Sequence, residues 1–191
     1  MTKLGRSFFE RDTRIVAIEL IGKTLNFKDQ GKHLSGMIVE TEAYYGAEDP
    51  ASHAYRGVTP RNKVMFGPAG FSYVYFTYGN HHCLNCVTEQ EGKAGAVLIR
   101  ALEPLEGLDV IKKNRPGCSI ENLTNGPGKL AQAFGLTRTH SGLDLTEANL
   151  YITGPKSPQL MHISVSKRIG ITRAKDQLLR FHLTGNKFVS K

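Results

Sequence analysis

The sequence predicts an α+β fold, in which residues 1–191 form a single compact domain around a curved, mostly antiparallel β-sheet with a protruding β-hairpin. Strand-like and helix-like segments follow one another in irregular order, which is typical of this class. Two strand-like runs flank a short Gly-Asn turn, and this pattern indicates a hairpin. No repeat or linker divides the chain, and 191 residues can bury a core without disulfides or a metal.

The first predicted elements are one helix and two strands. Asp12 or Thr13 can cap a helix that Gly22 ends. Its apolar positions recur with helical spacing at Val16, Ala17, Leu20 and Ile21. Residues 23–28 and 34–42 are then predicted as strands joined by a turn.

The middle of the chain is predicted to combine a long loop with a hairpin. Residues 43–69 are rich in Gly, Pro, Asp, His and Asn, and loops of this length inside a compact domain are usually functional. The aromatic run 71–78 is strongly strand-forming, and 82–88 returns after the turn to complete the hairpin. Residues 94–102 are predicted as a further strand.

The last part of the chain is predicted to hold two helices and two strands. The helices span 105–113 and 127–134. A loop-rich stretch over 137–160 precedes strands near 162–165 and 179–184.

The excess of positive charge lies in two parts of the chain, the middle and the last 36 residues. The net charge is +8, and residues 156–191 hold eight Lys or Arg but one acidic residue. Such a surface suits a polyanion, because each Lys or Arg that meets a phosphate releases a counterion. Candidates for these contacts are Lys167, Arg168, Arg173 and Lys175. A basic surface without a partner is the alternative.

Membrane insertion and secretion are not expected. No stretch approaches the roughly 20 apolar residues that a membrane helix requires. The N-terminus lacks the apolar core of a signal peptide. We therefore expect a cytoplasmic protein, and a monomer.

A zinc site at the cysteines is also not expected. Cys83 and Cys86 follow two histidines and form a CxxC unit, but no second Cys/His pair has a matching spacing. In a strand, residues three apart point to opposite faces. The three cysteines of the chain are an odd number, which argues against a disulfide framework. We expect no metal and no cofactor.

Two carboxylates in one predicted strand are the first candidates for catalysis. Glu40 and Glu42 share a strand face, about 6.6 Å apart along the backbone. This spacing would suit the acid and base of an inverting sugar hydrolase. Alternatively, one of the two pairs with an arginine, or both face solvent. Glu42 stands where the strand opens into the long loop beside Tyr44, a common place for an active-site acid or base.

The aromatic hairpin is the second candidate. Tyr73 and Tyr75 project from one face of the strand, and we expect Tyr73 to belong to the core. Tyr78 stands next to the predicted turn, where it has little core to reach. It could therefore act as a wedge between base pairs of a nucleic acid.

These segments, in this order, resemble the alkyladenine DNA glycosylase family, also called 3-methyladenine DNA glycosylases. The matching stretches are 38–44 (IVETEAY), Glu48-Asp49 with His53, 59–62 (TPRN), Met65-Phe66, 73–79, Cys83 with Asn85, 98–104 (LIRALEP), 126–130, 168–170 and 179–181. The resemblance covers almost the whole chain. One departure is Asn80, where family members commonly carry Met at the hairpin tip.

The resemblance implies a role for each matching residue. Glu42 would activate the attacking water, which Arg100 and the backbone carbonyl of Ile169 would help to hold. The flipped base would lie between Tyr44, His53 and Tyr75. Tyr78 would fill the gap that the base leaves in the duplex, and Asn85 would crowd the exocyclic amine of normal guanine.

The function implied is therefore DNA repair. The protein is expected to flip alkylated purines such as 3-methyladenine or 7-methylguanine, and deaminated ones such as hypoxanthine, out of double-stranded DNA. It would then hydrolyse the base–deoxyribose bond and so start base excision repair. Two other functions stay open at this point: a sugar hydrolase that uses both glutamates, and a DNA-binding module that recognises damage without catalysis.

Overall fold

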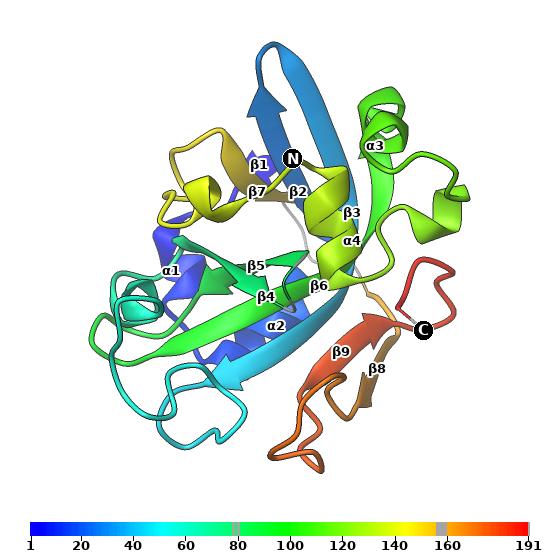
Figure 1. The fold of residues 1–191 in the computed structure, drawn as a ribbon. Coiled ribbons are helices and arrows are strands. Elements are labelled where there is room, and N and C mark those ends of the chain that lie inside the picture. The colour runs from blue at the N-terminus through cyan, green and yellow to red at the C-terminus, as the bar shows by residue number, and fades with distance from the viewer. Residues whose placement is uncertain (78, 80, 156–159, 191) are drawn as a thin grey trace.

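The protein is built on one antiparallel β-sheet. The computed structural model describes residues 1–77, 79, 81–155 and 160–190. Within them, nine strands form a sheet in the order β1-β7-β2-β3-β6-β5-β4, while β9 pairs with both β3 and β8. The strands are β1 (Thr2–Lys3), β2 (Thr24–Asp29), β3 (Lys32–Tyr45), β4 (Ser72–Thr77), β5 (His81–Val87), β6 (Gly95–Glu106), β7 (Leu150–Gly154), β8 (Ile163–Ser166) and β9 (Arg180–Leu183). The predicted α+β class is confirmed (Figure 1).

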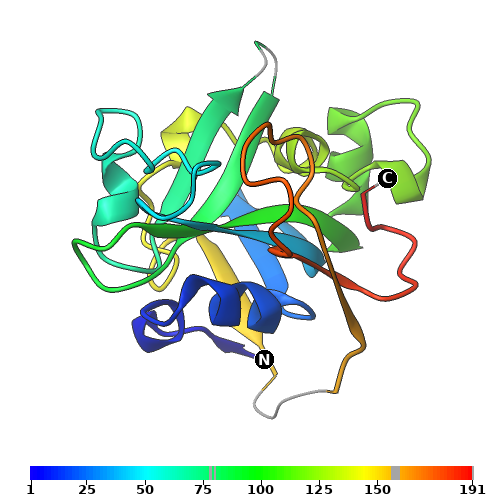
Figure 2. The same ribbon diagram turned by 90° about the horizontal axis from the view of Figure 1, so that it is seen from below.

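Short helices cover the sheet. They are α1 (Arg6–Phe9), α2 (Thr13–Leu20), α3 (Leu108–Asn114) and α4 (Pro127–Ala133), with 3-10 turns η1 (Lys63–Phe66), η2 (Ile120–Asn122) and η3 (Arg138–His140). In Figure 2 the blue helices α1 and α2 lie on one side of the sheet, and the green α3 and α4 lie on the other. None of the helices in the described ranges is long and apolar enough to cross a membrane.

Helix α2 begins and ends as the sequence predicts. The Asp12 carboxylate accepts hydrogen bonds from the N–H groups of Arg14 and Ile15, which satisfies the first turn. Leu20 is the last helical residue, and Gly22 follows with φ +81°, a conformation that glycine adopts without strain. The N–H of Gly22 donates to Ile38, so the chain passes directly from the helix to the sheet.

Strand β3 is the centre of the sheet. It pairs with β6 over most of its length, and its other edge changes partner from β2 to β9. The register with β6 is irregular around Glu40. Glu40 and Glu42 therefore have strands on both sides, opposite His182 and Arg180 of β9, and both side chains are fully buried.

Several element bounds differ from the prediction. The strand predicted to end at 42 runs to Tyr45, and β6 runs to Glu106, so the helix predicted at 105–113 was wrong in its first residues. Strands β1 and β7 and helix α1 were not predicted. Strand β7 lies inside the predicted loop-rich stretch, where it pairs with β1 and β2. Such pairing partners are remote in the sequence, and local propensity does not reveal them.

The predicted hairpin is present as β4 and β5. Its strands pair from Ser72–Cys86 to Thr77–His81. They rise away from the rest of the sheet at the top of Figure 2. Tyr78 and Asn80 lie outside the described residues, so the roles predicted for them stay predictions.

Candidate active site

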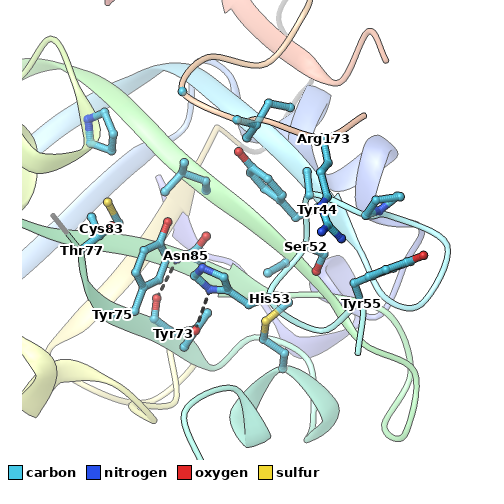
Figure 3. A pocket seen from close by; sticks show the side chains of 18 of the residues that line it. Tyr44, Ser52, His53, Tyr55, Tyr73, Tyr75, Thr77, Cys83, Asn85 and Arg173 are labelled. Carbon is cyan, nitrogen blue, oxygen red and sulfur yellow. Dashed lines mark hydrogen bonds between the residues drawn. The ribbon is translucent and has the colours of Figure 1, made fainter. Parts of the chain in front are cut away.

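One cavity of about 780 Å³ opens beside the hairpin. Most of its lining comes from the loop around 50–59, from β4 and β5, from β6 and from 169–173. Six of the eight residues to which the resemblance assigns a role line it: Tyr44, His53, Tyr75, Asn85, Arg100 and Ile169. The fold thus brings together residues that are up to about 125 positions apart in the sequence. Figure 3 shows the labelled side chains around this cavity.

Aromatic rings form one side of the cavity. The rings of His53 and Tyr75 meet edge to face, with 4.5 Å between their centroids. The Tyr73 hydroxyl lies 2.9 Å from Nδ1 of His53, and the Asn85 amide donates to the Tyr73 carbonyl at 2.9 Å (Figure 3). Tyr73 is buried, as expected of a core residue, but it also lines the cavity and holds the histidine.

His53 is neutral at physiological pH. Burial, together with the positive charge of Arg61, lowers the pKa of His53 from 6.5 to about 4. Arg61 also lies over the ring of Tyr75, with its guanidinium carbon 5.3 Å from the centroid. The next residue, Asn62, donates from its side chain to the carbonyls of His53 and Gly57. The TPRN motif therefore shapes the loop that carries His53.

Tyr44 stands apart from these rings, on another side of the cavity (Figure 3). Its hydroxyl donates to Oε2 of Glu42 at 2.7 Å. The guanidinium carbon of Arg168 lies 4.6 Å from the centre of the Tyr44 ring. Arg168 is buried and holds Asp49 through two hydrogen bonds, one of them 2.8 Å long. The ion pair fixes the start of the long loop against Tyr44.

The Asp49–Arg168 pair is the part of the site that sequence reasoning missed. Both residues belong to matching stretches, but they are 119 positions apart, and no spacing pattern connects them. The expectation that Arg168 contacts phosphate was wrong, because its side chain is completely enclosed. Arg173 and Lys175 are exposed, and Arg173 lies at the cavity.

Glu42 lies directly behind the cavity wall. Its side chain has no exposed surface, and three lining residues contact its carboxylate. Oε1 accepts from the N–H of Ile169 at 2.8 Å, whereas Oε2 faces Tyr44 and Nη1 of Arg100, 3.3 Å away. Burial raises the pKa of Glu42, and it outweighs the opposite effects of Arg100, Ile169 and Tyr44.

Glu40 has a different environment. Its carboxylate accepts hydrogen bonds from Arg100, Arg180 and twice from Ser190, all between 2.6 and 2.8 Å. Burial alone would raise the pKa of Glu40, but these partners outweigh it and keep the pKa below its ordinary value. Three of the donors meet Oε1, and the N–H of Ser190 meets Oε2. Both glutamates are buried and pair with Arg100, so neither faces solvent, and Glu40 pairs with Arg180 in addition.

The resemblance implies a role for the backbone carbonyl of Ile169, whereas the contact with Glu42 in the structure is made by the backbone N–H of Ile169. The carbonyl's role stays a prediction. Within the described ranges, no three His, Cys, Asp or Glu side chains gather as metal ligands. Cys83 and Cys86 are buried in β5 as free thiols.

Comparison with known proteins extends these observations. The family model described as methylpurine-DNA glycosylase (MPG) matches residues 7–187. The match places the chain among the DNA glycosylases, the enzymes that excise damaged bases in DNA repair. Within that class, the chain belongs to the methylpurine-DNA glycosylase family.

Relatives of similar length support this membership. A protein of Carboxydothermus hydrogenoformans is 51% identical over 98% of both chains. Proteins of Prosthecochloris aestuarii and Methanoculleus marisnigri are 48% and 47% identical, over 100% and 98% of this chain and 92% and 98% of their own. All three carry the name "Putative 3-methyladenine DNA glycosylase".

Proposed function

We propose that this protein is a monofunctional glycosylase that flips alkylated purines out of duplex DNA and hydrolyses the base–deoxyribose bond. Its substrates would be purines such as 3-methyladenine and 7-methylguanine, with deaminated hypoxanthine as a further one. The observation that carries the proposal is a buried glutamate with a raised pKa, Glu42, directly behind an aromatic cavity.

The cavity suits a flat, positively charged base. A purine alkylated at N3 or N7 is a cation, and aromatic faces attract cations by about 0.5–2 kcal/mol. Tyr44 on one side and Tyr75 with His53 on the other supply such surfaces. Since His53 is neutral, it adds no repulsion against the cationic base.

Asn85 would contribute selectivity. It lies buried on the cavity wall, and its amide is held by the Tyr73 carbonyl, so it has little freedom to move aside. In this position it would crowd the exocyclic amine of normal guanine. Selectivity begins before this contact, because flipping costs a few kcal/mol and least for a damaged, poorly paired base.

Glu42 would act as the general base. Its raised pKa makes the carboxylate a stronger base than an ordinary glutamate, and the N–H of Ile169 and the Tyr44 hydroxyl hold it in one orientation. The buried negative charge would also stabilise positive charge that develops on the sugar. Arg100 and the carbonyl of Ile169 would help to hold the water.

The two other functions fit the geometry less well. A sugar hydrolase needs a second carboxyl group to act as the acid, but Glu40 has a lowered pKa and is occupied by four hydrogen bonds. A binding module without catalysis gives no reason for a buried carboxylate with a raised pKa behind the cavity. We propose that the enzyme acts as a monomer in the cytoplasm, without a cofactor.

Release of free bases tests the proposal. The purified protein is incubated with methylated duplex DNA and with inosine-containing duplexes, and liquid chromatography identifies the bases in solution. We expect methylated purines to be released into solution, while normal purines stay attached to the DNA. If damaged duplex is bound but no base is released, the protein is a binding module and the proposed reaction is wrong.

A further inference from the structure

The segment that follows β9 reaches Glu40 in strand β3. Asn186 donates to the Glu103 carboxylate at 2.7 Å, and the Phe188 side chain is buried against Val39 and Ala101. These two contacts bring Ser190 to Glu40, 150 positions earlier in the chain. In Figure 1 this red segment curls back beside the sheet.

Ser190 contacts both partners of the buried ion pair. Its N–H and its hydroxyl donate to the two oxygens of Glu40, each at 2.7 Å. The same hydroxyl oxygen accepts from Nη2 of Arg100 at 3.3 Å. Arg180 adds a hydrogen bond to Glu40 at 2.6 Å and reaches the Ser190 carbonyl.

The three nitrogens of the Arg100 guanidinium therefore have three different partners. Nε donates to Glu40 at 2.8 Å, Nη2 to Ser190, and Nη1 lies 3.3 Å from Glu42. A guanidinium is planar and rigid. When Glu40 and Ser190 hold two of its nitrogens, the direction of the third is fixed.

We propose that Ser190 and Arg180 are positioning residues, which act through Glu40 to keep Nη1 of Arg100 against the Glu42 carboxylate. The inference rests on the proposed function of Glu42 as the base. It assigns to the segment 186–190 a part in the reaction, although none of its residues lines the cavity. We call the contacts of Ser190 and Arg180 with Glu40 and Arg100 the clamp. Without the clamp, the Arg100 guanidinium turns toward Glu40 alone, and Glu42 loses the positive charge that lowers its pKa.

Three variants separate positioning from folding. Ser190→Ala removes the hydroxyl that contacts both Glu40 and Arg100, whereas Ser190→Thr restores a hydroxyl. Lys187→Met is the control, because Lys187 lies in the same segment but pairs with Glu121 at the surface. None of them removes the charge of Glu40 or Glu42.

The measurements are single-turnover excision rates across pH and affinity for a damaged duplex. We expect Ser190→Ala to excise about 10- to 100-fold more slowly, as when a catalytic group is misplaced. Its affinity should change by less than about twofold. The acid limb of its pH profile should move to higher pH, because a displaced Arg100 lowers the pKa of Glu42 less. Ser190→Thr and Lys187→Met should match the wild type.

Two outcomes would overturn the inference. The first is a Ser190→Ala variant that melts at a lower temperature but retains the rate and pH profile of the wild type, since the segment is then only structural. The second is unchanged hydrogen exchange of the Arg100 Nε–H, followed by NMR, where we expect faster exchange in Ser190→Ala. If the wild type itself releases no base, the proposed function fails, and the exchange measurement alone decides whether the clamp exists.

Discussion

Glu40 and Glu42 are two positions apart in one strand, yet their surroundings give them opposite properties. Glu40 accepts hydrogen bonds from two arginines and from the N–H and hydroxyl of Ser190, which lower its pKa, whereas burial raises the pKa of Glu42. The sequence places both on one face but does not reveal which of them Arg180 and Ser190 occupy. That distinction depends on β9 and the segment after it, about 140 to 150 residues away.

The raised pKa of Glu42 predicts a pH dependence of the excision rate. The reaction needs the carboxylate, so the rate should fall as pH decreases through the Glu42 pKa, which lies above its ordinary value of 4.5. His53 titrates lower, near pH 4, and should not contribute to this limb. Single-turnover rates between about pH 4 and 8 measure it. An excision rate that falls only at or below pH 4.5 would contradict the assigned environment of Glu42.

Arg168 predicts a stability effect. In Arg168→Met, Asp49 stays buried without its cationic partner, and breaking such a pair costs about 3–5 kcal/mol. Urea denaturation measures the free energy of unfolding. The control is Lys167→Met, whose ion pair with Asp176 is exposed and should contribute less than about 1 kcal/mol. Equal effects of the two substitutions would show that the buried pair is not a structural element of the loop.

Strong local signals in the sequence were sufficient to predict some of the helices and strands. Strands that depend on pairing with distant segments could not be predicted in this way. The capping aspartate and the helical spacing located α2, and the aromatic run with its Gly-Asn turn located the β4–β5 hairpin. Strand β7 has alternating buried positions, but in the sequence it is short and surrounded by turn residues. It is a strand because β1 and β2 pair with both of its edges.

The hairpin carries a prediction for Tyr78, which follows the last residue of β4 in the sequence. If its ring fills the gap left by the flipped nucleotide, Tyr78→Ser should lower the flipped fraction through lost stacking of roughly 1–3 kcal/mol. A fluorescent base analogue beside the lesion reports that fraction. The loss should be smaller opposite a mismatch, where flipping is already cheap. Wild-type flipping, or an unfolded variant, would show that Tyr78 is not a wedge.

Over the whole molecule, the excess of positive charge predicts binding governed by phosphates. With about five phosphate contacts, a log–log plot of affinity against salt should have a slope near −4 to −5. Replacing Arg173 and Lys175 by Gln should flatten it, because both are exposed and Arg173 lies at the cavity.

Lys28 and Lys32 provide the matched control for charge. They lie at the exposed end of the β2–β3 hairpin and outside the cavity lining, so replacing both should leave the slope unchanged. An affinity that does not depend on salt would contradict a phosphate-based interface.

The irregular order of strand-like and helix-like segments predicted the α+β class. The family resemblance, carried by compact stretches such as IVETEAY and TPRN, pointed to residues that line the cavity. The sequence did not reveal the interactions that hold those residues in place. The Asp49–Arg168 pair and the contacts between Glu40 and Ser190 each join segments more than 100 positions apart. Only the folded sheet brings these partners together.

The base-release rate of Glu42→Gln tests the central claim most directly. The amide keeps the shape of the side chain but cannot accept the proton of the water, so we expect the single-turnover rate to fall by about 10²–10⁴-fold. Binding to the damaged duplex should stay within a few-fold of the wild type, because Glu42 has no exposed surface to offer the DNA. A Glu42→Gln variant that releases methylated purines at the wild-type rate would contradict the claim that Glu42 activates the water.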